Sequence, residues 1–326
     1  MQKNIQLITL WFSGYNNFDY RKQVRYFQEI LMKSVEILLD QKAMNGEGPV
    51  WDAEAQVLYW VDIVRATIFV FDPKTGQNRT IDLSGQFSTI GTLVTRKKGG
   101  LIFAPDNCIA SLDLETLSIS VLAEPEINLP KNRFNDGKCD PKGRFLVGSM
   151  AKKPDGTPTG SLYVMDTDLS VRKLRDGLII TNGMDWSPNS RLFYLADSFS
   201  RDVWVYDYDL ERGEIDHQRV AFRLPDSIGV ADGLTVDQEG MLWLAVWDGG
   251  CIMRWNPYNG KLLETIHFPA KRTTSCVFGG PEMDELYVTS ATIDLVEKDW
   301  QNFPHNGALM RVKTGVKGME SFSFLG

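Results

Sequence analysis

Asp232-Gly-Leu-Thr-Val-Asp237 is the segment from which the fold can be worked out, because its pattern occurs four times along the chain. In each copy an oxygen-bearing side chain lies five residues before an Asp or a Ser. The other copies are Glu47-Gly-Pro-Val-Trp-Asp52, Asn135-Asp-Gly-Lys-Cys-Asp140 and Asn182-Gly-Met-Asp-Trp-Ser187. Their leading residues are 88, 47 and 50 positions apart. These gaps indicate two, one and one periods of an internal repeat.

A short apolar run follows each repeated position by about 10 to 12 residues and predicts a strand. Six such runs are Leu58–Val61, Leu101–Ala104, Phe145–Gly148, Leu192–Leu195, Leu242–Ala245 and Leu286–Thr289. Most units continue with a third strand that ends in a tight turn, such as Phe71-Asp-Pro-Lys-Thr-Gly76, and with a fourth strand. The pattern predicts an all-β fold: a six-bladed β-propeller with four-stranded antiparallel blades around a central channel. A solenoid or a sandwich is the alternative. Ser34–Leu39 is predicted to be the outer strand of the last blade.

Length and composition fit one soluble globular domain, with 326 residues, 43% hydrophobic and 24% charged. We assign residues 32–326 to the propeller and residues 1–31 to an N-terminal extension, either upstream of a natural start at Met32 or loosely ordered. The net charge of −7 and the scattered Lys and Arg argue against nucleic-acid binding. No apolar run reaches the roughly 20 residues that span a bilayer. Four distant cysteines without metal-site spacing favour a reducing, cytoplasmic compartment, and we expect a monomer or weak homo-oligomer.

Equivalent positions of a closed rotational repeat converge on its axis, so the four leading side chains are expected at one mouth of the channel. They are Glu47, Asn135, Asn182 and Asp232. Oxygen ligands without His or Cys favour Ca²⁺, Mg²⁺ or Mn²⁺. The alternative is that each residue only forms a turn, since Asp-Gly and Asn-Gly are common turn dipeptides. Glu47 weakens that alternative because Glu is not a favoured turn residue.

The segments around these residues resemble the senescence-marker-protein (regucalcin), gluconolactonase and luciferin-regenerating-enzyme family, in wording closer to its bacterial sugar-lactonase members. The segments that carry the resemblance are Gly46–Trp51, Asn132–Asp140, Thr181–Trp186, Ala231–Asp237 and Thr273–Gly280.

The resemblance implies a six-bladed propeller with one divalent cation in the channel: Ca²⁺ in first place, with Mn²⁺, Mg²⁺ or Zn²⁺ as alternatives. Glu47, Asn182 and Asp232 would be its ligands, Asp232 would also be the general base, and Arg133 and Asn135 would contact substrate. The implied reaction is gluconolactonase-like hydrolysis of a small-molecule sugar-acid lactone to the aldonic acid. The cation would polarise the carbonyl and hold the attacking water.

One loop departs from the family pattern. After the strand that ends at Met150, some members place an acidic residue that meets sugar hydroxyls, whereas this chain has Lys152 and Lys153. The identity of the lactone is therefore open. Three other functions keep the same fold: a non-catalytic calcium-binding or regulatory protein of regucalcin type, an organophosphate esterase using the same site, and a protein-interaction propeller.

Overall fold

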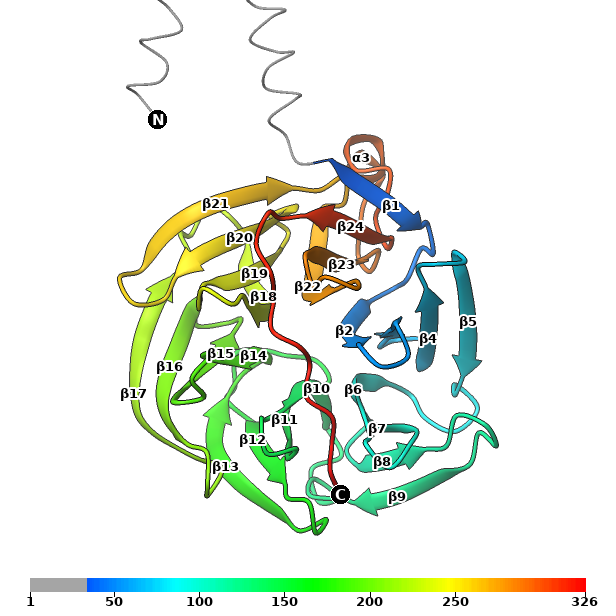
Figure 1. The fold of residues 1–326 in the computed structure, drawn as a ribbon, viewed down its shortest axis with the longest axis vertical. Helices are drawn as coiled ribbons and strands as arrows, with labels where there is room; N and C mark the ends of the chain where they lie inside the picture. Colours follow the sequence, from blue (N-terminus) through cyan, green and yellow to red (C-terminus); the bar gives the residue numbers. More distant parts are fainter. Residues whose placement is uncertain (1–33) are drawn as a thin grey trace, which may run out of the picture. The chain divides into compact units, whose positions relative to one another are not determined.

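The computed structural model describes residues 34–326, and the predicted extension at residues 1–31 lies outside the described residues. Val35–Gly326 forms one compact unit. Its strands form six sheets of four strands, each antiparallel and each built from strands that follow one another along the chain, apart from one strand of the last sheet. The sheets are arranged as blades in a ring (Figure 1). The predicted six-bladed propeller is confirmed.

The strands of each blade are given from the innermost outward. Blade 1 contains β2 (Gly46–Asp52), β3 (Val57–Asp62), β4 (Thr67–Asp72) and β5 (Gln77–Asp82). Blade 2 contains β6 (Ile90–Thr95), β7 (Leu101–Pro105), β8 (Ile109–Leu112) and β9 (Ile119–Ala123). Blade 3 contains β10 (Asn132–Cys139), β11 (Phe145–Ala151), β12 (Gly160–Met165) and β13 (Val171–Leu178).

The second half of the ring repeats this order. Blade 4 contains β14 (Thr181–Trp186), β15 (Leu192–Asp197), β16 (Asp202–Asp209) and β17 (Glu214–Arg223). Blade 5 contains β18 (Val230–Val236), β19 (Leu242–Trp247), β20 (Cys251–Asn256) and β21 (Lys261–His267). Blade 6 contains β22 (Arg272–Gly279), β23 (Glu285–Ala291), β24 (Leu309–Lys313) and β1 (Val35–Leu39). A short helix, α3 (Glu297–Asn302), lies between β23 and β24.

Blade 6 closes the ring by combining strands from both ends of the described chain. β1 pairs antiparallel with β24, with Val35 opposite Val312 and Glu36 opposite Arg311. The Arg311 side chain donates hydrogen bonds to the carboxylates of Glu36 and Glu285, which ties the outer strand to the blade. The prediction that Ser34–Leu39 supplies the outer strand of the last blade is confirmed.

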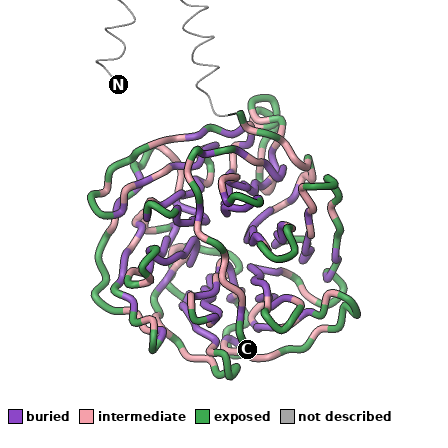
Figure 2. Tube along the Cα trace, viewed as in Figure 1, coloured by how far each residue is buried: buried purple, intermediate pink, exposed green. Residues whose placement is uncertain are grey.

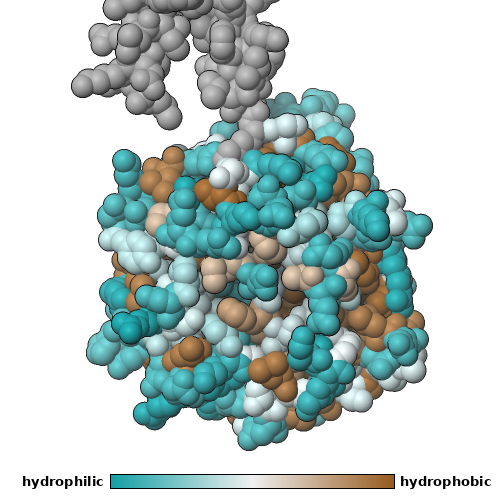
Figure 3. Space-filling model, in the orientation of Figure 1, coloured by the Kyte–Doolittle hydropathy of each residue, from teal (hydrophilic) through white to brown (hydrophobic). Residues whose placement is uncertain are grey.

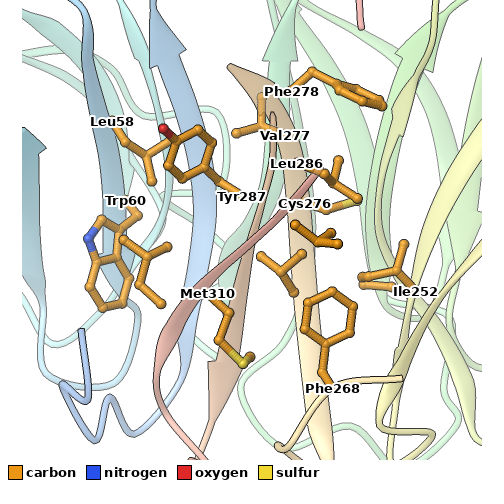
Figure 4. Packing of buried hydrophobic residues seen from close by; sticks show 14 of the residues in the cluster. Leu58, Trp60, Ile252, Phe268, Cys276, Val277, Phe278, Leu286, Tyr287 and Met310 are labelled. Atoms are coloured by element: carbon orange, nitrogen blue, oxygen red, sulfur yellow. The ribbon is translucent and has the colours of Figure 1, made fainter. Parts of the chain in front are cut away.

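Apolar side chains pack between neighbouring blades, because a single sheet buries neither of its faces alone. Trp51 of blade 1 stacks on Tyr287 of blade 6 at 5.5 Å between ring centroids. Figure 4 shows the core of blade 6 between its two neighbours, with Trp60 of blade 1 on one side and Ile252 of blade 5 on the other. Figure 2 shows burial concentrated toward the middle of the ring and exposure along its rim. Trp247 at the end of β19 is half-buried, and the Arg272 guanidinium lies 4.6 Å from its ring centroid.

A C-terminal strap, residues 317–326, crosses the face of the ring where the inner strands end (Figure 1). It begins at blade 5, where Gln238 N donates to Lys317 O at 2.9 Å, and reaches blade 2, where Phe324 N donates to Thr95 O at 2.8 Å. The Phe324 side chain is fully buried. Side chains on this face are mostly hydrophilic, with scattered apolar patches (Figure 3). Within residues 34–326, no helix has the length and apolarity needed to cross a bilayer.

Candidate metal and substrate site

Every inner strand has a break in its hydrogen-bonded ladder near its N-terminal end. The register shifts lie between Glu47 and Val50, Ile90 and Leu93, Phe134 and Gly137, Thr181 and Met184, Ala231 and Leu234, and Thr273 and Cys276. A bulge bends its strand and changes the direction of the side chains beside it, and bulges are common next to active sites. Asn135, Asn182 and Asp232 lie within their breaks, and Glu47 is the last paired residue before its own.

Glycines at these breaks allow neighbouring inner strands to approach closely. A Cβ atom on Gly183 would lie 2.3 Å from Leu234 N and 2.6 Å from Asp232 O. A Cβ atom on Gly91 would lie 2.5 Å from Asn135 O. No side chain fits at such distances, so glycine permits the backbone approach. The approach of β14 to β18 brings Asn182 beside Asp232.

Glu47, Asn182 and Asp232 meet as buried polar groups. They are 6%, 5% and 4% exposed. The Glu47 and Asp232 carboxyl groups lie close enough to shift each other's pKa, and the Asn182 side chain lies close enough to lower that of Asp232. Asn182 Nδ2 donates to Ser198 Oγ at 3.0 Å, whereas its Oδ1 is buried without a hydrogen-bond partner among residues 34–326. A buried polar atom without a partner needs an explanation, and here the Asn182 oxygen lies beside two carboxyl groups. Together these oxygen atoms could coordinate a bound cation.

The carboxyl groups of Glu47 and Asp232 have raised pKa values, so their simultaneous ionisation is unfavourable. Burial, followed by the negative charge of Asp136, raises the pKa of Glu47 from 4.5 to about 8. Burial, followed by the charge of Glu47, raises the pKa of Asp232 well above its ordinary value. Two buried carboxyl groups in contact cannot both ionise cheaply without a nearby cation.

Arg133 is next to this pair and is held in place by Asn135. Arg133 Nη1 donates to Asn135 Oδ1 and to Phe134 O, both at 2.7 Å, and Asn135 Nδ2 donates to Thr181 O at 2.9 Å. Burial lowers the pKa of Arg133 to about 10, although the carboxylates of Glu47 and Asp232 act in the opposite direction. Both the oxygen and the amide group of the Asn135 side chain are therefore engaged within the protein, and Asn135 orients the guanidinium.

A second polar cluster lies three residues further along the inner strands of blades 3, 4 and 5. Asp185 Oδ2 accepts from Lys138 Nζ at 2.7 Å, from Thr235 Oγ1 at 3.1 Å and from Val236 N at 3.0 Å. Lys138, Asp185 and Thr235 come three residues after Asn135, Asn182 and Asp232 respectively. The cluster therefore links the strands of blades 3, 4 and 5 directly behind the residues that they bring to the mouth. This cluster was not identified from the sequence. The signal that could have revealed it is that all three residues follow the repeated position of their blade by the same three residues.

The residues at the mouth fit a hard divalent cation. Two carboxyl groups could balance its charge, and the unpartnered Asn182 Oδ1 could complete a set of three oxygen donors. Within the described part of the chain, no group of three or more His, Cys, Asp and Glu side chains gathers as a metal cluster. Any cation held here would therefore rely on a carboxamide as well as carboxylates, which favours Ca²⁺, Mg²⁺ or Mn²⁺ over a zinc-type site.

Comparison with known proteins identifies the family. Residues 45–292 match the model of the SMP-30/Gluconolactonase/LRE-like region. The chain belongs to the SMP-30/gluconolactonase/LRE-like family. The matched region begins in blade 1 and ends just after β23, so it contains every residue of the mouth described above.

Members of the SMP-30/gluconolactonase/LRE-like family align with this chain over most of both lengths. Regucalcin of Xenopus laevis is 37% identical, covering 90% of this chain and 98% of the relative. A Bacillus subtilis (strain 168) protein named "Putative sugar lactone lactonase YvrE" is 34% identical, covering 88% and 97%. A solved structure titled as a calcium-binding protein, regucalcin, from Agrobacterium tumefaciens is 26% identical with a TM-score of 0.84, covering 90% and 97%. These values do not single out the bacterial members.

All of the sequence-predicted site residues lie at the mouth, while the two loop lysines lie on its edge. Asp232 lies beside both Glu47 and Asn182, and Arg133 with Asn135 forms the adjoining wall. Lys152 and Lys153 are exposed just after β11. The ligand and catalytic roles of these residues remain predictions.

Proposed function

We propose that this protein hydrolyses a sugar-acid lactone to the aldonic acid with one divalent cation, Ca²⁺ in first place, held by Glu47, Asn182 and Asp232. The observation that carries the proposal is the unpartnered Asn182 Oδ1 beside two carboxyl groups that cannot ionise together unaided. Membership of a family that includes gluconolactonases supports the reaction class. The four free cysteines are buried, which agrees with a cytoplasmic setting.

Each side chain has a role that its surroundings support. A divalent cation bound here would act as a Lewis acid toward the lactone carbonyl. Asp232 accepts the proton of the attacking water, and a cation's charge would keep its carboxylate ionised for that step. Arg133 uses only Nη1 in its hydrogen bonds within residues 34–326, so its other N–H groups can donate to ring oxygens of the substrate. Asn135 positions Arg133.

The test is acidification of a weakly buffered aldonolactone solution, followed with a pH indicator. Protein supplied with Ca²⁺ or Mn²⁺ should acidify the solution, and a chelator should stop the acidification until the metal is restored. A panel of aldonolactones against several metals would then identify the best pair. An unchanged rate after Asp232→Ala would contradict the mechanism.

A second candidate is calcium binding without turnover, favoured by the similarity to the Agrobacterium tumefaciens relative, which is described as a calcium-binding protein. Both functions use the same three oxygen-bearing side chains, so lactone turnover is the observation that separates them. Calorimetric Ca²⁺ binding that is lost in Glu47→Gln, together with no hydrolysis across the lactone panel, would establish the second candidate instead.

A further inference from the structure

Two lysines lie directly opposite each other where blade 3 meets the mouth. The β10–β11 ladder pairs Asn132 with Ala151, and Lys152 N donates to Lys131 O at 2.8 Å, so the pairing continues by one more residue. Side chains of directly opposite residues lie on one face, with Cβ atoms about 5 Å apart, and like charges there repel each other. We call Lys131 and Lys152 the basic pair.

Within the described residues, no carboxylate neutralises the basic pair. Both lysines are exposed, and among residues 34–326 neither they nor the neighbouring Lys153 form an ion pair. Asp155, the acidic residue of the same loop, instead accepts from Thr157 N. A like-charge pair without a partner is unusual in a chain whose net charge is −7. Its positive charge is therefore available to an anion from solution.

The basic pair is on the same side of blade 3 as the site. Alternate residues of a strand share a face, so Lys131 is on the face of Arg133. Arg133 in turn lies close enough to Glu47 and Asp232 for their charges to raise its pKa against the effect of burial. The three cations thus follow one another from the mouth edge toward the carboxyl groups.

The loop that carries Lys152 is fixed to the inner strand. Asn132 Nδ2 donates to Thr159 O at 2.9 Å, and Thr159 Oγ1 donates to Asn132 Oδ1 at 3.1 Å. These two hydrogen bonds tie the end of the 151–159 loop to the first residue of β10. The lysine backbones are therefore held at the mouth, and only the side-chain rotamers remain to be ordered on binding.

We propose that the basic pair selects lactones that carry a second, anionic group, a carboxylate or a phosphate ester, on the carbon chain away from the ring ester. This proposal rests on the lactonase function above. A neutral aldonolactone offers the pair only hydroxyl groups, whereas an anion gains charge-assisted hydrogen bonds from two ammonium groups. The ester bond that breaks and the water that attacks are those of the proposed hydrolysis, and the anion takes no part in the chemistry.

The experiment compares kcat/KM for gluconolactone with that for 6-phosphogluconolactone and for a glucarolactone at low ionic strength. We expect the anionic lactones to be preferred about tenfold, which corresponds to about 1.4 kcal/mol. Lys131→Glu/Lys152→Glu should abolish the preference and leave the neutral lactone within about twofold. Added salt should weaken the preference in the wild type. The phosphate and carboxylate substrates show which anion is favoured.

Lys98→Glu is the matched control, because Lys98 is an exposed lysine in the β6–β7 turn at the opposite end of an inner strand. It should leave the preference unchanged. Equal kcat/KM for neutral and anionic lactones, or a preference that survives reversal of the basic pair, would overturn the proposal while leaving the lactonase function intact. If no lactone is hydrolysed, the lactonase function fails, and calorimetric binding of 6-phosphogluconate against gluconate decides this proposal: equal affinities refute it.

Discussion

Replacing Glu47 with a glutamine should stabilise the protein when metal is removed. The pKa of Glu47 is raised from 4.5 to about 8, so at pH 7 the folded protein retains a proton that the unfolded chain has released. Each pKa unit corresponds to about 1.4 kcal/mol, so burying this carboxyl group lowers the free energy of unfolding by on the order of 3 kcal/mol at pH 7. The neutral carboxamide of Glu47→Gln would carry no such penalty, and its oxygen could still accept from Gly48 N, as Glu47 Oε2 does at 3.0 Å.

The sign of the pH dependence follows from proton binding. The folded state binds more protons than the unfolded state between about pH 4.5 and pH 8, so the stability of the wild type falls as pH rises through that window. The gain from Glu47→Gln should therefore be small at pH 5 and largest near pH 8. Equilibrium urea unfolding in the presence of a chelator, repeated across this range, measures the difference directly.

Adding Ca²⁺ should reverse the order of the two proteins. A ligand that binds only the folded state stabilises it according to its concentration and affinity, and Glu47→Gln removes one proposed ligand. Glu115→Gln is the matched control, since Glu115 is exposed and makes no ion pair within the described residues. The reasoning is refuted if Glu47→Gln is less stable than the wild type in chelator at pH 8, or if the difference does not vary with pH.

Three further substitutions test other parts of the argument. Asp232→Asn should lower kcat/KM for lactone hydrolysis at least about 100-fold, measured by pH indicator with saturating metal, because the general base is lost. Lys138→Met should lower the free energy of urea unfolding by about 3–5 kcal/mol, because it leaves the buried Asp185 carboxylate without its ion-pair partner. Adding Asp185→Asn should restore much of the lost free energy. Strictly additive losses in the double variant would contradict the ion-pair argument. Phe324→Ala should cost about 3–5 kcal/mol in the same assay, and Leu325→Ala, at a residue 49% exposed, much less.

The repeat pattern was sufficient to predict the ring. Strands such as Leu58–Val61 and Leu286–Thr289 lie within β3 and β23, because a repeated apolar run bounded by turns has few alternatives to a blade. Glu47 and Asp232 could be placed together for the same reason: rotational equivalence brings residues far apart in sequence to one axis. Their carboxyl groups lie close enough in the folded chain to shift each other's pKa.

Features that depend on contacts between particular neighbours could not be predicted in this way. The Lys138–Asp185 pair forms because blades 3 and 4 are adjacent and happen to carry opposite charges at equivalent positions. The half-buried Trp247 of blade 5 likewise lies against the Arg272 guanidinium of blade 6, a contact that depends on which residues the two neighbouring blades carry. The C-terminal strap has an irregular backbone, and its sequence has no hydrophobic periodicity. Its path across the ring could therefore not be predicted from a sequence pattern.

The pairing of β1 with β24 closes the ring, so the arrangement of the Glu47 and Asp232 carboxyl groups depends on the last blade being formed. Glu47 belongs to the first blade and Asp232 to the fifth, and blade 6 is what separates them around one side of the ring. A nascent chain that lacks β24 cannot complete blade 6, so the ring that places the two carboxyl groups beside each other is not closed until β24 has left the ribosome. Cation binding should therefore appear in a single late step of folding, and a protein cut within blade 6 should lose it as a whole.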